Sequence, residues 1–386
     1  MSLLFIYERR DTMLKKYNSS VNTLPQDVVE LILERLPIKS LLRFRSVSKT
    51  WKLTIQTRRF QERQLIHHSQ SSGPDILFVH LSDHGLNTDA RRRLVFGSSM
   101  VYNVCFPTLC TSVCPCICDG LVCFYTYSVP SVNVVVVNPA TRWHQSLPLA
   151  RIQQLLFDRI TKRSFRSPRP NLGFGKDKLK GTYKPVFLYN SSGLGLDNVT
   201  TCEVFDFSTN AWRYVHPAAP YRINVDHDPV YLDGSLYWFT KCEETKVLSF
   251  DLHTETFQVI CKAPFSHAHD DPHSFSMCIL DNCLCVSDSN WPTQDIWLLD
   301  PSGGNIKTWK RMCSIDLTKT RDWSGESSLL AIAVSEKNKL LLRGRGWYQP
   351  LLIHDLRTKS YELLFRPNKA LSSVCYFQSL FSPLSN

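Results

Sequence analysis

Apolar residues follow two different periods along this chain, and the change falls near residue 75. Before it, they recur every three or four positions, as Val28, Ile32 and Leu36 do, which is the spacing of one helix face. Beyond it, apolar and polar residues alternate in short runs that end at turn-forming residues, which is typical of β-strands. The pattern predicts a small helical unit followed by a much longer β domain.

The helical unit carries boundary signals. Thr23 and Gln26 have the spacing of a capping box, with Pro25 in the first turn, so the first helix is predicted to begin there. Pro37 disfavours the helical conformation of the residue before it and ends this helix. Two more short helices are predicted over residues 40–44 and 48–55.

These three helices hold more large apolar residues than a unit of their size can bury, because such small domains bury only ~60% of their unfolded surface. A partner protein is therefore expected to complete the core. Two alternatives are a self-contained three-helix bundle and a helix-turn-helix DNA reader, since RFRSVSK at 43–49 is basic. A recognition helix needs exposed polar residues for base edges, and these helices are apolar on most faces, so we favour docking.

The segment from residue 24 to residue 51 resembles the F-box of plant F-box proteins, without a gap. The matching residues are Leu24, Pro25, Asp27, Leu36, Pro37, Lys39, Ser40, Leu41, Arg43, Phe44, Arg45, Val47, Lys49 and Trp51. The resemblance implies that this segment binds the Skp-type adaptor of a cullin-based SCF ubiquitin ligase and, through it, the cullin and RING subunits. The residues expected at that interface are Leu24, Pro25, Val28, Ile32, Leu36, Pro37, Leu41, Leu42, Val47 and Trp51.

One motif recurs through the β domain. An alternating apolar strand runs into Asp or Asn, a Thr follows three residues later, and an aromatic residue opens the next strand. This is the chemistry of a hairpin, because an Asp or Asn side chain can cap nearby backbone N–H groups. The copies lie at 134–143, 202–212, 247–257 and 351–361, with a longer fifth copy at 296–309. Their regular recurrence identifies Asp206, Asp251 and Asp355 as turn residues and not as catalytic carboxylates.

A second turn precedes four of these motifs by 18 or 19 residues. These turns are Asp119-Gly120, Asp233-Gly234, Asp281-Asn282 and Lys337-Asn338. Two turns at a fixed offset define a repeated antiparallel sheet, and a period of ~40 to 50 residues points to the blades of a β-propeller, six or seven in number. A β-sandwich is the alternative, in which the fixed offsets would be accidental.

Several phrases of this domain resemble the F-box-associated interaction domain of plant F-box proteins. They are CDGL at 118–121, NPATRW at 138–143, LGFG at 172–175 and YLDGSLYW at 231–238. The resemblance implies a kelch-like propeller that presents a substrate protein to the ligase, without assigning individual contacts. We therefore expect a multidomain α and β chain: an N-terminal tail at 1–20, the F-box at 21–67, a linker at 68–74 and the propeller-like domain at 75–386.

The net charge of +11 is concentrated in two segments. Residues 1–70 hold 13 Lys and Arg against 6 Asp and Glu, and residues 151–180 hold 9 against 2. A basic balance suits nucleic acid, but it equally attracts an acidic protein over long range. We favour the protein partner and keep a basic nucleic-acid-binding regulator as the alternative. The second segment is interpreted as a solvated connection, with substrate recognition or nuclear import as further options.

Cysteine content and the N-terminus bear on the compartment. Fourteen cysteines indicate disulfides only in an oxidising compartment. The apolar run in MSLLFIYERRD is shorter than a signal-peptide core, and the longest aliphatic run, at 132–137, has the length of a strand. We therefore expect reduced thiols, no membrane association and a location in the cytoplasm, the nucleus or both.

Two clusters invite a metal-binding interpretation. HAHDDPH at 267–273 resembles the metal-binding string of metallo-β-lactamase-like hydrolases, but Pro272 displaces the last histidine by one position. The other cluster is Cys110, Cys114, Cys116 and Cys118, whose spacing lacks the pairs of a structural zinc site, so buried thiols are expected. No nucleophile elbow, phosphate-binding loop or dinucleotide fingerprint is present. We predict no catalytic residue, metal or cofactor and leave open whether the propeller binds a small ligand.

Both resemblances imply the same function. The chain is expected to be a non-catalytic substrate-recognition subunit of an SCF-type E3 ubiquitin ligase, which directs target proteins to ubiquitination and proteasomal degradation. No motif identifies the target protein.

Overall fold

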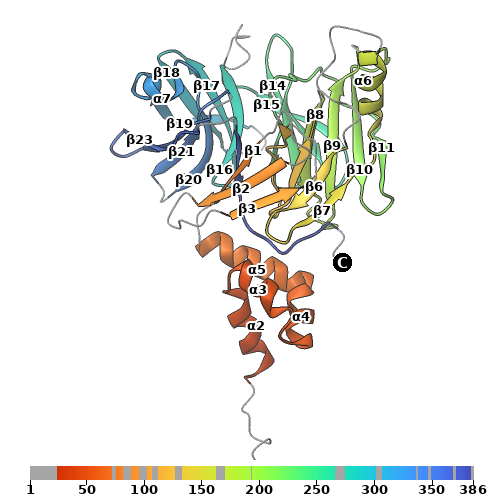
Figure 1. Ribbon diagram of the computed structural model, residues 1–386. Helices are drawn as coiled ribbons and strands as arrows, with labels where there is room; N and C mark the ends of the chain where they lie inside the picture. The colour runs from red at the N-terminus through yellow and green to blue at the C-terminus, as the bar shows by residue number, and fades with distance from the viewer. Residues whose placement is uncertain are drawn as a thin grey trace, which may run out of the picture.

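The computed structural model places a unit of short helices beside a ring of β-sheets (Figure 1). It describes residues 24–71, 75–80, 88–94, 102–106, 112–126, 133–161, 170–192, 194–265, 274–300, 307–335, 338–346, 349–367 and 371–383. The first of these segments forms the helical unit, and the others form the β domain with one further helical region at each of two insertions.

The helical unit consists of α2 (Gln26–Glu34), α3 (Ile38–Phe44), α4 (Lys49–Gln56) and α5 (Arg58–Ser71). The three predicted helices are confirmed as α2 to α4. Sequence analysis missed α5, whose last four residues, 68–71, fall within the predicted linker. Its residues are mostly polar, so no apolar period marks it, although Phe60 and Gln64 are buried and anchor it. None of the described helices is long and apolar enough to cross a membrane.

The start of α2 differs from the prediction. Its N-cap residue is Pro25, and no side chain caps the helix. The Gln26 amide donates instead to Thr54 Oγ1 of α4 at 3.2 Å. Thr23 lies outside the described residues, so the predicted capping box is not seen, and Gln26 is used to hold α2 against α4.

The core of the helical unit includes one residue from the far end of the chain, Leu380. Arg63 of α5 also binds two carboxylates of α2, those of Glu30 at 3.3 Å and Glu34 at 3.0 Å. The buried apolar residues of this core are Leu33, Ile38, Leu41, Ile55, Phe60 and Leu380. The helical unit therefore shares its core with the C-terminal segment.

The β domain consists, within its described residues, of six four-stranded antiparallel sheets, so the predicted propeller is confirmed with six blades. The first sheet contains β1 (Asp75–His80), β2 (Thr88–Leu94), β3 (Tyr102–Phe106) and β24 (Leu371–Tyr376). The second contains β4 (Ser112–Val113), β5 (Val122–Tyr125), β6 (Val135–Asn138) and β7 (Trp143–Ser146). The third contains β8 (Asn171–Lys176), β9 (Tyr183–Asn190), β10 (Thr200–Asp206) and β11 (Ala211–Tyr214).

The remaining three sheets follow the same order. The fourth contains β12 (Val230–Leu232), β13 (Ser235–Phe239), β14 (Lys246–Asp251) and β15 (Phe257–Lys262). The fifth contains β16 (Phe275–Leu280), β17 (Cys283–Asn290), β18 (Thr293–Leu299) and β19 (Trp309–Asp316). After η1 (Leu317–Thr320) and α7 (Arg321–Ser324), the sixth contains β20 (Leu330–Ser335), β21 (Lys339–Arg343), β22 (Leu351–Asp355) and β23 (Ser360–Phe365).

The ring closes because the last strand joins the first sheet. β24 pairs antiparallel with β1, with Cys375 opposite Ile76, whereas each other sheet uses strands that follow one another in the chain. The first strands of neighbouring sheets contact one another from β8 through β12, β16 and β20 to β24. These strands therefore surround the propeller axis, and closure removes the open sheet edge at the joint.

Both predicted turn types are confirmed where the structure describes them. In the turns after β6, β10, β14 and β22, the side-chain oxygen of Asn138, Asp206, Asp251 or Asp355 accepts the backbone N–H two residues later. The turn after Asp300 lies largely outside the described residues. At the second turn type, both residues have positive φ in Asp119-Gly120, Asp233-Gly234 and Asp281-Asn282, which is the backbone of a tight hairpin.

Both turn types lie on the same face of the propeller. The N–H of Leu252, after Asp251, bonds to the Gly234 carbonyl at 2.9 Å, which brings one turn of each type together. α5 lies on this face too, since Arg58 Nη2 donates to the carbonyl of Gly181 in the β8–β9 turn at 2.9 Å. We call this the helix-side face and the opposite one the open face.

Residues 151–180 are not the solvated connection that was predicted. α6 (Arg151–Thr161) and β8 account for most of them, while 162–169 lie outside the described residues. Ile152 is buried, and the buried Glu203 carboxylate accepts the N–H groups of Arg151 at 2.8 Å and Ile152 at 2.9 Å. A carboxylate at this position satisfies the free N–H groups of a helix start. The basic residues that dominate this segment obscure the apolar period of the helix in the sequence.

The C-terminal segment, residues 377–383, joins the propeller to the helical unit and crosses the helix-side face (dark blue in Figure 1). The amide of Asn138 donates to the carbonyls of Ser379 at 3.1 Å and Phe381 at 2.8 Å. The Ser379 hydroxyl donates to the Asp119 carbonyl. Since Leu380 lies in the helical core, this segment belongs to both units.

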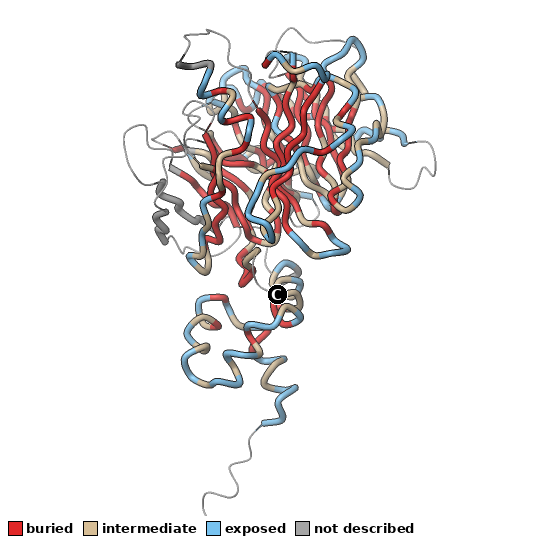
Figure 2. The backbone as a smooth tube through the Cα atoms, turned by 90° about the vertical axis from the view of Figure 1, so that its right-hand side faces the viewer, coloured by how far each residue is buried: buried red, intermediate tan, exposed pale blue. Residues whose placement is uncertain are grey.

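Burial separates the two units (Figure 2). Long buried stretches run through the strands of the propeller, whereas much of the helical unit is exposed or half-buried. The two units therefore meet through α5 and the C-terminal segment, while most of the surface of α2 and α4 faces solvent.

Candidate functional site

Large apolar side chains are exposed on the helical unit outside its buried core. Leu24, Leu31 and Ile32 lie at helical spacing on or before α2 and are 59%, 42% and 48% exposed. Val47, between α3 and α4, and Leu53, on α4, are 65% and 67% exposed. Exposed apolar groups of this number are typical of a surface that binds another protein. We call Leu24, Val28, Leu31, Ile32, Val47 and Leu53 the apolar surface.

The structure divides the predicted interface residues into three groups. Leu24, Pro25, Val28, Ile32, Pro37 and Val47 are exposed. Leu36, Leu42 and Trp51 are half-buried and pack against the helical core, where the rings of Trp51 and Phe44 lie 5.4 Å apart. Leu41 is completely buried. The residues of the first group are available to a partner without rearrangement of the helices. The residues of the other two groups support those helices from within the core.

Sequence analysis did not assign Leu31 and Leu53 to the interface. Leu31 follows Leu24 by seven positions, so helical spacing alone places it on the same stripe. Leu53 carries no such signal, because α4 has one buried residue, Ile55, and the sequence does not say which side of the helix faces the core.

A cavity of about 740 Å³ opens on the other side of the molecule, at the propeller axis. Its walls come from the segments before β12, β16 and β20 and from the ends of β17 and β21. The opposite ends of these first strands carry the helix-side turns, so the cavity lies on the open face. We call it the open-face cavity.

Charged and hydroxyl groups line the open-face cavity. The arginines are Arg343, whose Nη1 donates to the Ser373 carbonyl, and Arg345, whose Nη2 donates to the Phe275 carbonyl at 3.0 Å. Asp228 is exposed to the cavity, yet burial by surrounding protein raises the pKa of its carboxyl group against the attraction of both arginines. Burial also lowers the pKa of Arg343. The cavity lining therefore brings acids and arginines together.

A second cavity of about 470 Å³ lies at the helix-side end of the axis. Leu65 and Ile66 of α5 form part of its wall, together with apolar residues of the inner strands. Arg343 lines this cavity as well as the open-face cavity. The propeller axis is thus more apolar next to the helical unit than on the open face.

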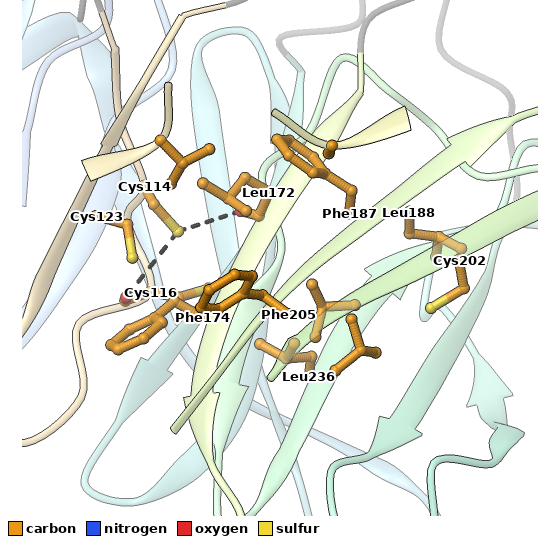
Figure 3. Packing of buried hydrophobic residues seen from close by; sticks show 14 of the residues in the cluster. Cys114, Cys116, Cys123, Leu172, Phe174, Phe187, Leu188, Cys202, Phe205 and Leu236 are labelled. Carbon is orange, nitrogen blue, oxygen red and sulfur yellow. Dashed lines mark hydrogen bonds between the residues drawn. The ribbon is translucent and has the colours of Figure 1, made fainter. Parts of the chain in front are cut away.

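The cysteine cluster is part of the propeller core (Figure 3). Cys114, Cys116 and Cys118 follow β4 and are buried, as predicted. The Cys114 thiol donates to the Leu172 carbonyl of the third sheet at 3.1 Å, and the Cys116 thiol donates to the carbonyl of Pro229, just before the fourth sheet, at 3.1 Å. These bonds tie the second sheet to two others. Burial raises the pKa of Cys114 well above its ordinary value. Cys110 lies outside the described residues.

No metal site is evident in the part of the chain that the structure describes, since no three His, Cys, Asp or Glu side chains are grouped to hold an ion. The histidine string at 267–273 lies outside the described residues. Two of the described lysines of the basic segment are engaged with acids: Lys176 binds Asp119 at 2.7 Å, and Lys178 binds Asp233. These lysines stabilise helix-side turns.

Comparison with protein families identifies both units. Residues 22–63 match the model of the F-box domain, and residues 106–383 match that of the F-box associated beta propeller domain.

Three Arabidopsis thaliana proteins are similar over most of their length. F-box protein At1g11270 is 58% identical over 76% of this chain and 92% of its own. F-box/LRR-repeat/kelch-repeat protein At1g09650 is 49% identical over 94% of this chain and 97% of its own, and F-box protein At2g34280 is 47% identical over 94% and 100%.

Proposed function

The chain belongs to the F-box proteins that carry an F-box-associated β-propeller, and from this we propose that it is the substrate-recognition subunit of an SCF-type ubiquitin ligase. The F-box helices bind a Skp-type adaptor and, through it, the cullin and RING subunits. The propeller binds a target protein, which is then ubiquitinated and degraded by the proteasome. The complex acts in the cytoplasm, the nucleus or both.

The apolar surface is the observation that carries this proposal. Outside its buried core, the helical unit exposes six large apolar side chains on α2, α4 and the segments beside them. Burying apolar surface contributes about 25 cal/mol per Å² removed from water, so an adaptor that covers these side chains gains a large part of its binding free energy there. Because α5 and the C-terminal segment occupy the side next to the propeller, the adaptor has free access to α2.

Positioning is the contribution that this chain makes to the reaction. α5 is fixed to the propeller by the hydrogen bond of Arg58 with Gly181, and the C-terminal segment is fixed to Asn138. A target bound to the propeller is thereby held at a set distance from the adaptor. Such an arrangement raises the effective concentration of acceptor lysines at the conjugating enzyme without bond chemistry by this chain.

The adaptor contact is tested by binding of the full-length chain to a recombinant plant Skp-type adaptor. A Leu31→Asp/Ile32→Asp double variant places two charges in the apolar surface and should lower affinity by at least about a hundredfold. Val199→Asp is the matched control, because Val199 is 46% exposed on the propeller and its replacement should leave affinity unchanged. The proposal fails if the wild-type chain binds no adaptor or if the double variant binds as well as the wild type.

Exposed residues give a cleaner test of adaptor binding than predicted interface residues that lie in the helical core, such as Trp51. Trp51 and Leu41 are part of the helical core, so replacing either with alanine would reduce folding and adaptor binding together. Leu31 and Ile32 avoid this ambiguity because neither is buried.

A further inference from the structure

One lysine lies where the propeller, α5 and the C-terminal segment meet. Lys176 is the last residue of β8, and its side chain is 16% exposed. We propose that Lys176 is a positioning residue of the ligase: it fixes the direction of the propeller relative to the helical unit and thereby selects which lysines reach the conjugating enzyme. This inference rests on the proposed function, because the direction of the propeller matters only if the helical unit binds the adaptor.

The ammonium group of Lys176 contacts three other parts of the chain. It donates to Asp119 Oδ2, in the turn before β5, at 2.7 Å, and it lies 4.0 Å from Glu62 Oε1 of α5. It also lies 5.2 Å from the centre of the Phe381 ring in the C-terminal segment, which is within cation–π range. An ammonium group has three donors and a compact charge, so one group can serve all three partners. We call Lys176, Asp119, Glu62 and Phe381 the junction.

Both acids of the junction are themselves tied to neighbouring elements. The carbonyl of Asp119 accepts the Ser379 hydroxyl of the C-terminal segment. Glu62 Oε1 accepts Arg58 Nε at 3.0 Å, and the same guanidinium group donates to the Gly181 carbonyl in the β8–β9 turn. The junction therefore belongs to a continuous polar network that runs from α5 through the propeller turns to the C-terminal segment.

Apolar packing does not fix α5 to the propeller along its whole length. Leu65 and Ile66 line the helix-side cavity of about 470 Å³, and Ile66 is 55% exposed. Empty space beside a helix forfeits the dispersion contacts that a filled interface provides. The polar contacts of Arg58 and Glu62, in the first half of α5, therefore carry much of the attachment together with the C-terminal segment.

Lys178 is the matched control, because it contacts a turn alone. It lies two residues after Lys176 and pairs with Asp233 on the same face of the propeller, and its side chain is 57% exposed. Among the described residues, its ammonium group has no ion pair with α5 or with the C-terminal segment. A variant of Lys178 therefore reports what the loss of a lysine does to a helix-side turn without any loss at the junction.

The experiment measures the distance between the two units of the full-length chain by single-molecule energy transfer. Fluorophores are attached through unnatural amino acids at Lys52 of α4 and at Asn198 in an open-face link, both of which are exposed. The wild type should give one narrow distribution of distances. Lys176→Met keeps a long unbranched side chain without its charge and should widen the distribution about twofold or more, because a charge-assisted bond and an ion pair are lost. Lys178→Met should leave the width unchanged.

Two further variants separate the junction from general stability. Lys176→Arg keeps the positive charge, so it should restore most of the narrow distribution. Glu62→Gln removes only the partner on α5, and because the Glu62 side chain is 45% exposed, this variant is expected to fold even if Lys176→Met does not. It should widen the distribution less than Lys176→Met does, and adding it to Lys176→Met should widen the distribution little further, because both changes remove the same contact.

The functional readout is the pattern of ubiquitinated lysines on the chain itself, mapped by mass spectrometry. The ligase is reconstituted with a Skp-type adaptor, cullin, RING subunit and conjugating enzyme. In the wild type, most ubiquitin should lie on the few lysines that the junction holds within reach. Lys176→Met should spread ubiquitin over more lysines and lower the share of the most modified one about twofold, with adaptor affinity unchanged. A role confined to the turn predicts a lower melting temperature and an unchanged pattern, as for Lys178→Met.

The inference is overturned if Lys176→Met and Glu62→Gln keep the wild-type distribution of distances, or if the distribution widens while the pattern of modified lysines stays the same. Equal widening by Lys178→Met would also overturn it, because the effect would then come from the turns. Adaptor binding separates the two proposals. A wild-type chain that binds no adaptor refutes the ligase role, whereas a chain that binds adaptor but does not respond to Lys176→Met refutes only this inference.

Discussion

The two faces of the propeller are built in different ways. On the helix-side face, the same two short turns recur from blade to blade, with an Asp or Asn cap in one and positive φ in the other. On the open face, the links between second and third strands vary from two residues, at Trp291-Pro292, to nine, at 191–199. The helical unit lies on the regular face, and the polar cavity opens on the irregular one.

This difference shows which part of the fold is free to change. The helix-side turns satisfy backbone groups locally, so one solution serves every blade. They also form the platform on which α5 and the C-terminal segment rest. The open-face links do not hold α5 or the C-terminal segment, so their length and chemistry can vary with the ligand, as is usual for loops on a rigid scaffold.

The largest expected effect comes from adding one methyl group to a glycine on each face. Gly120 on the helix-side face and Gly195 on the open face have nearly equal φ, +73° and +72°. A Cβ at Gly120 would lie 2.5 Å from the Phe377 carbonyl oxygen, whereas nothing lies within 4 Å of one at Gly195. We expect Gly195→Ala to cost about 1 kcal/mol from backbone strain and Gly120→Ala about 3 kcal/mol, because a steric clash is added.

Urea unfolding of the two variants measures this contrast through the shift in midpoint. Equal losses would mean that the C-terminal segment moves aside at no cost and that the helix-side face is not the more constrained of the two.

The regularity of the helix-side face explains why sequence analysis predicted the fold. A turn that recurs at a fixed offset can be recognised from its residues alone. Asp206 and Asp355 could therefore be assigned to turns without any knowledge of tertiary structure. α5 and α6 were missed for the converse reason. Each occurs once, and their anchors are a few buried residues, such as Phe60 and Ile152, within polar or basic sequence.

The candidate sites were less predictable than the fold. An apolar residue such as Leu41 or Ile32 has the same hydrophobicity whether it fills its own core or faces a partner, so the sequence could not separate the two groups. Arg343 and Asp228 are far apart in the sequence and meet only because the propeller closes into a ring. No motif spans such a site.

A smaller effect is expected from exchanging amide and carboxylate at the repeated turn. Asn138 is the one Asn among the five repeated positions, and its amide holds Ser379 and Phe381 while its oxygen caps the turn. Asn138→Asp keeps the cap but replaces two N–H donors with an acceptor that faces carbonyl groups. We expect a loss of about 2 kcal/mol in urea unfolding and faster hydrogen exchange at residues 377–383.

The reverse exchange provides the control. Asp206→Asn changes the equivalent turn, where the side chain is half-exposed and bonds only within the turn, so the expected loss is below about 1 kcal/mol. Similar losses for the two exchanges would argue that Asn138 acts only as a turn residue and that the C-terminal segment is held by other contacts.

The smallest expected effect concerns carboxylates on the two faces, whose contributions to stability change with pH in opposite directions. The Ser208 hydroxyl and nearby N–H groups lower the pKa of Asp206, and N–H groups of the turn lower that of Asp355, both below the ordinary value of 3.8. Such groups stabilise the fold above the unfolded pKa, and this stabilisation is lost as pH falls through the folded pKa. Burial raises the pKa of Asp228, so the unfavourable contribution of this charge is present above its folded pKa and disappears as pH falls through the folded pKa toward 3.8.

Between neutral pH and about pH 3, the Asp206→Asn/Asp355→Asn double variant should therefore lose thermal stability less steeply than the wild type, and Asp228→Asn more steeply. Melting temperatures across this range decide the matter, because slopes that change in the same direction would show that the two faces do not differ in how they hold their acids.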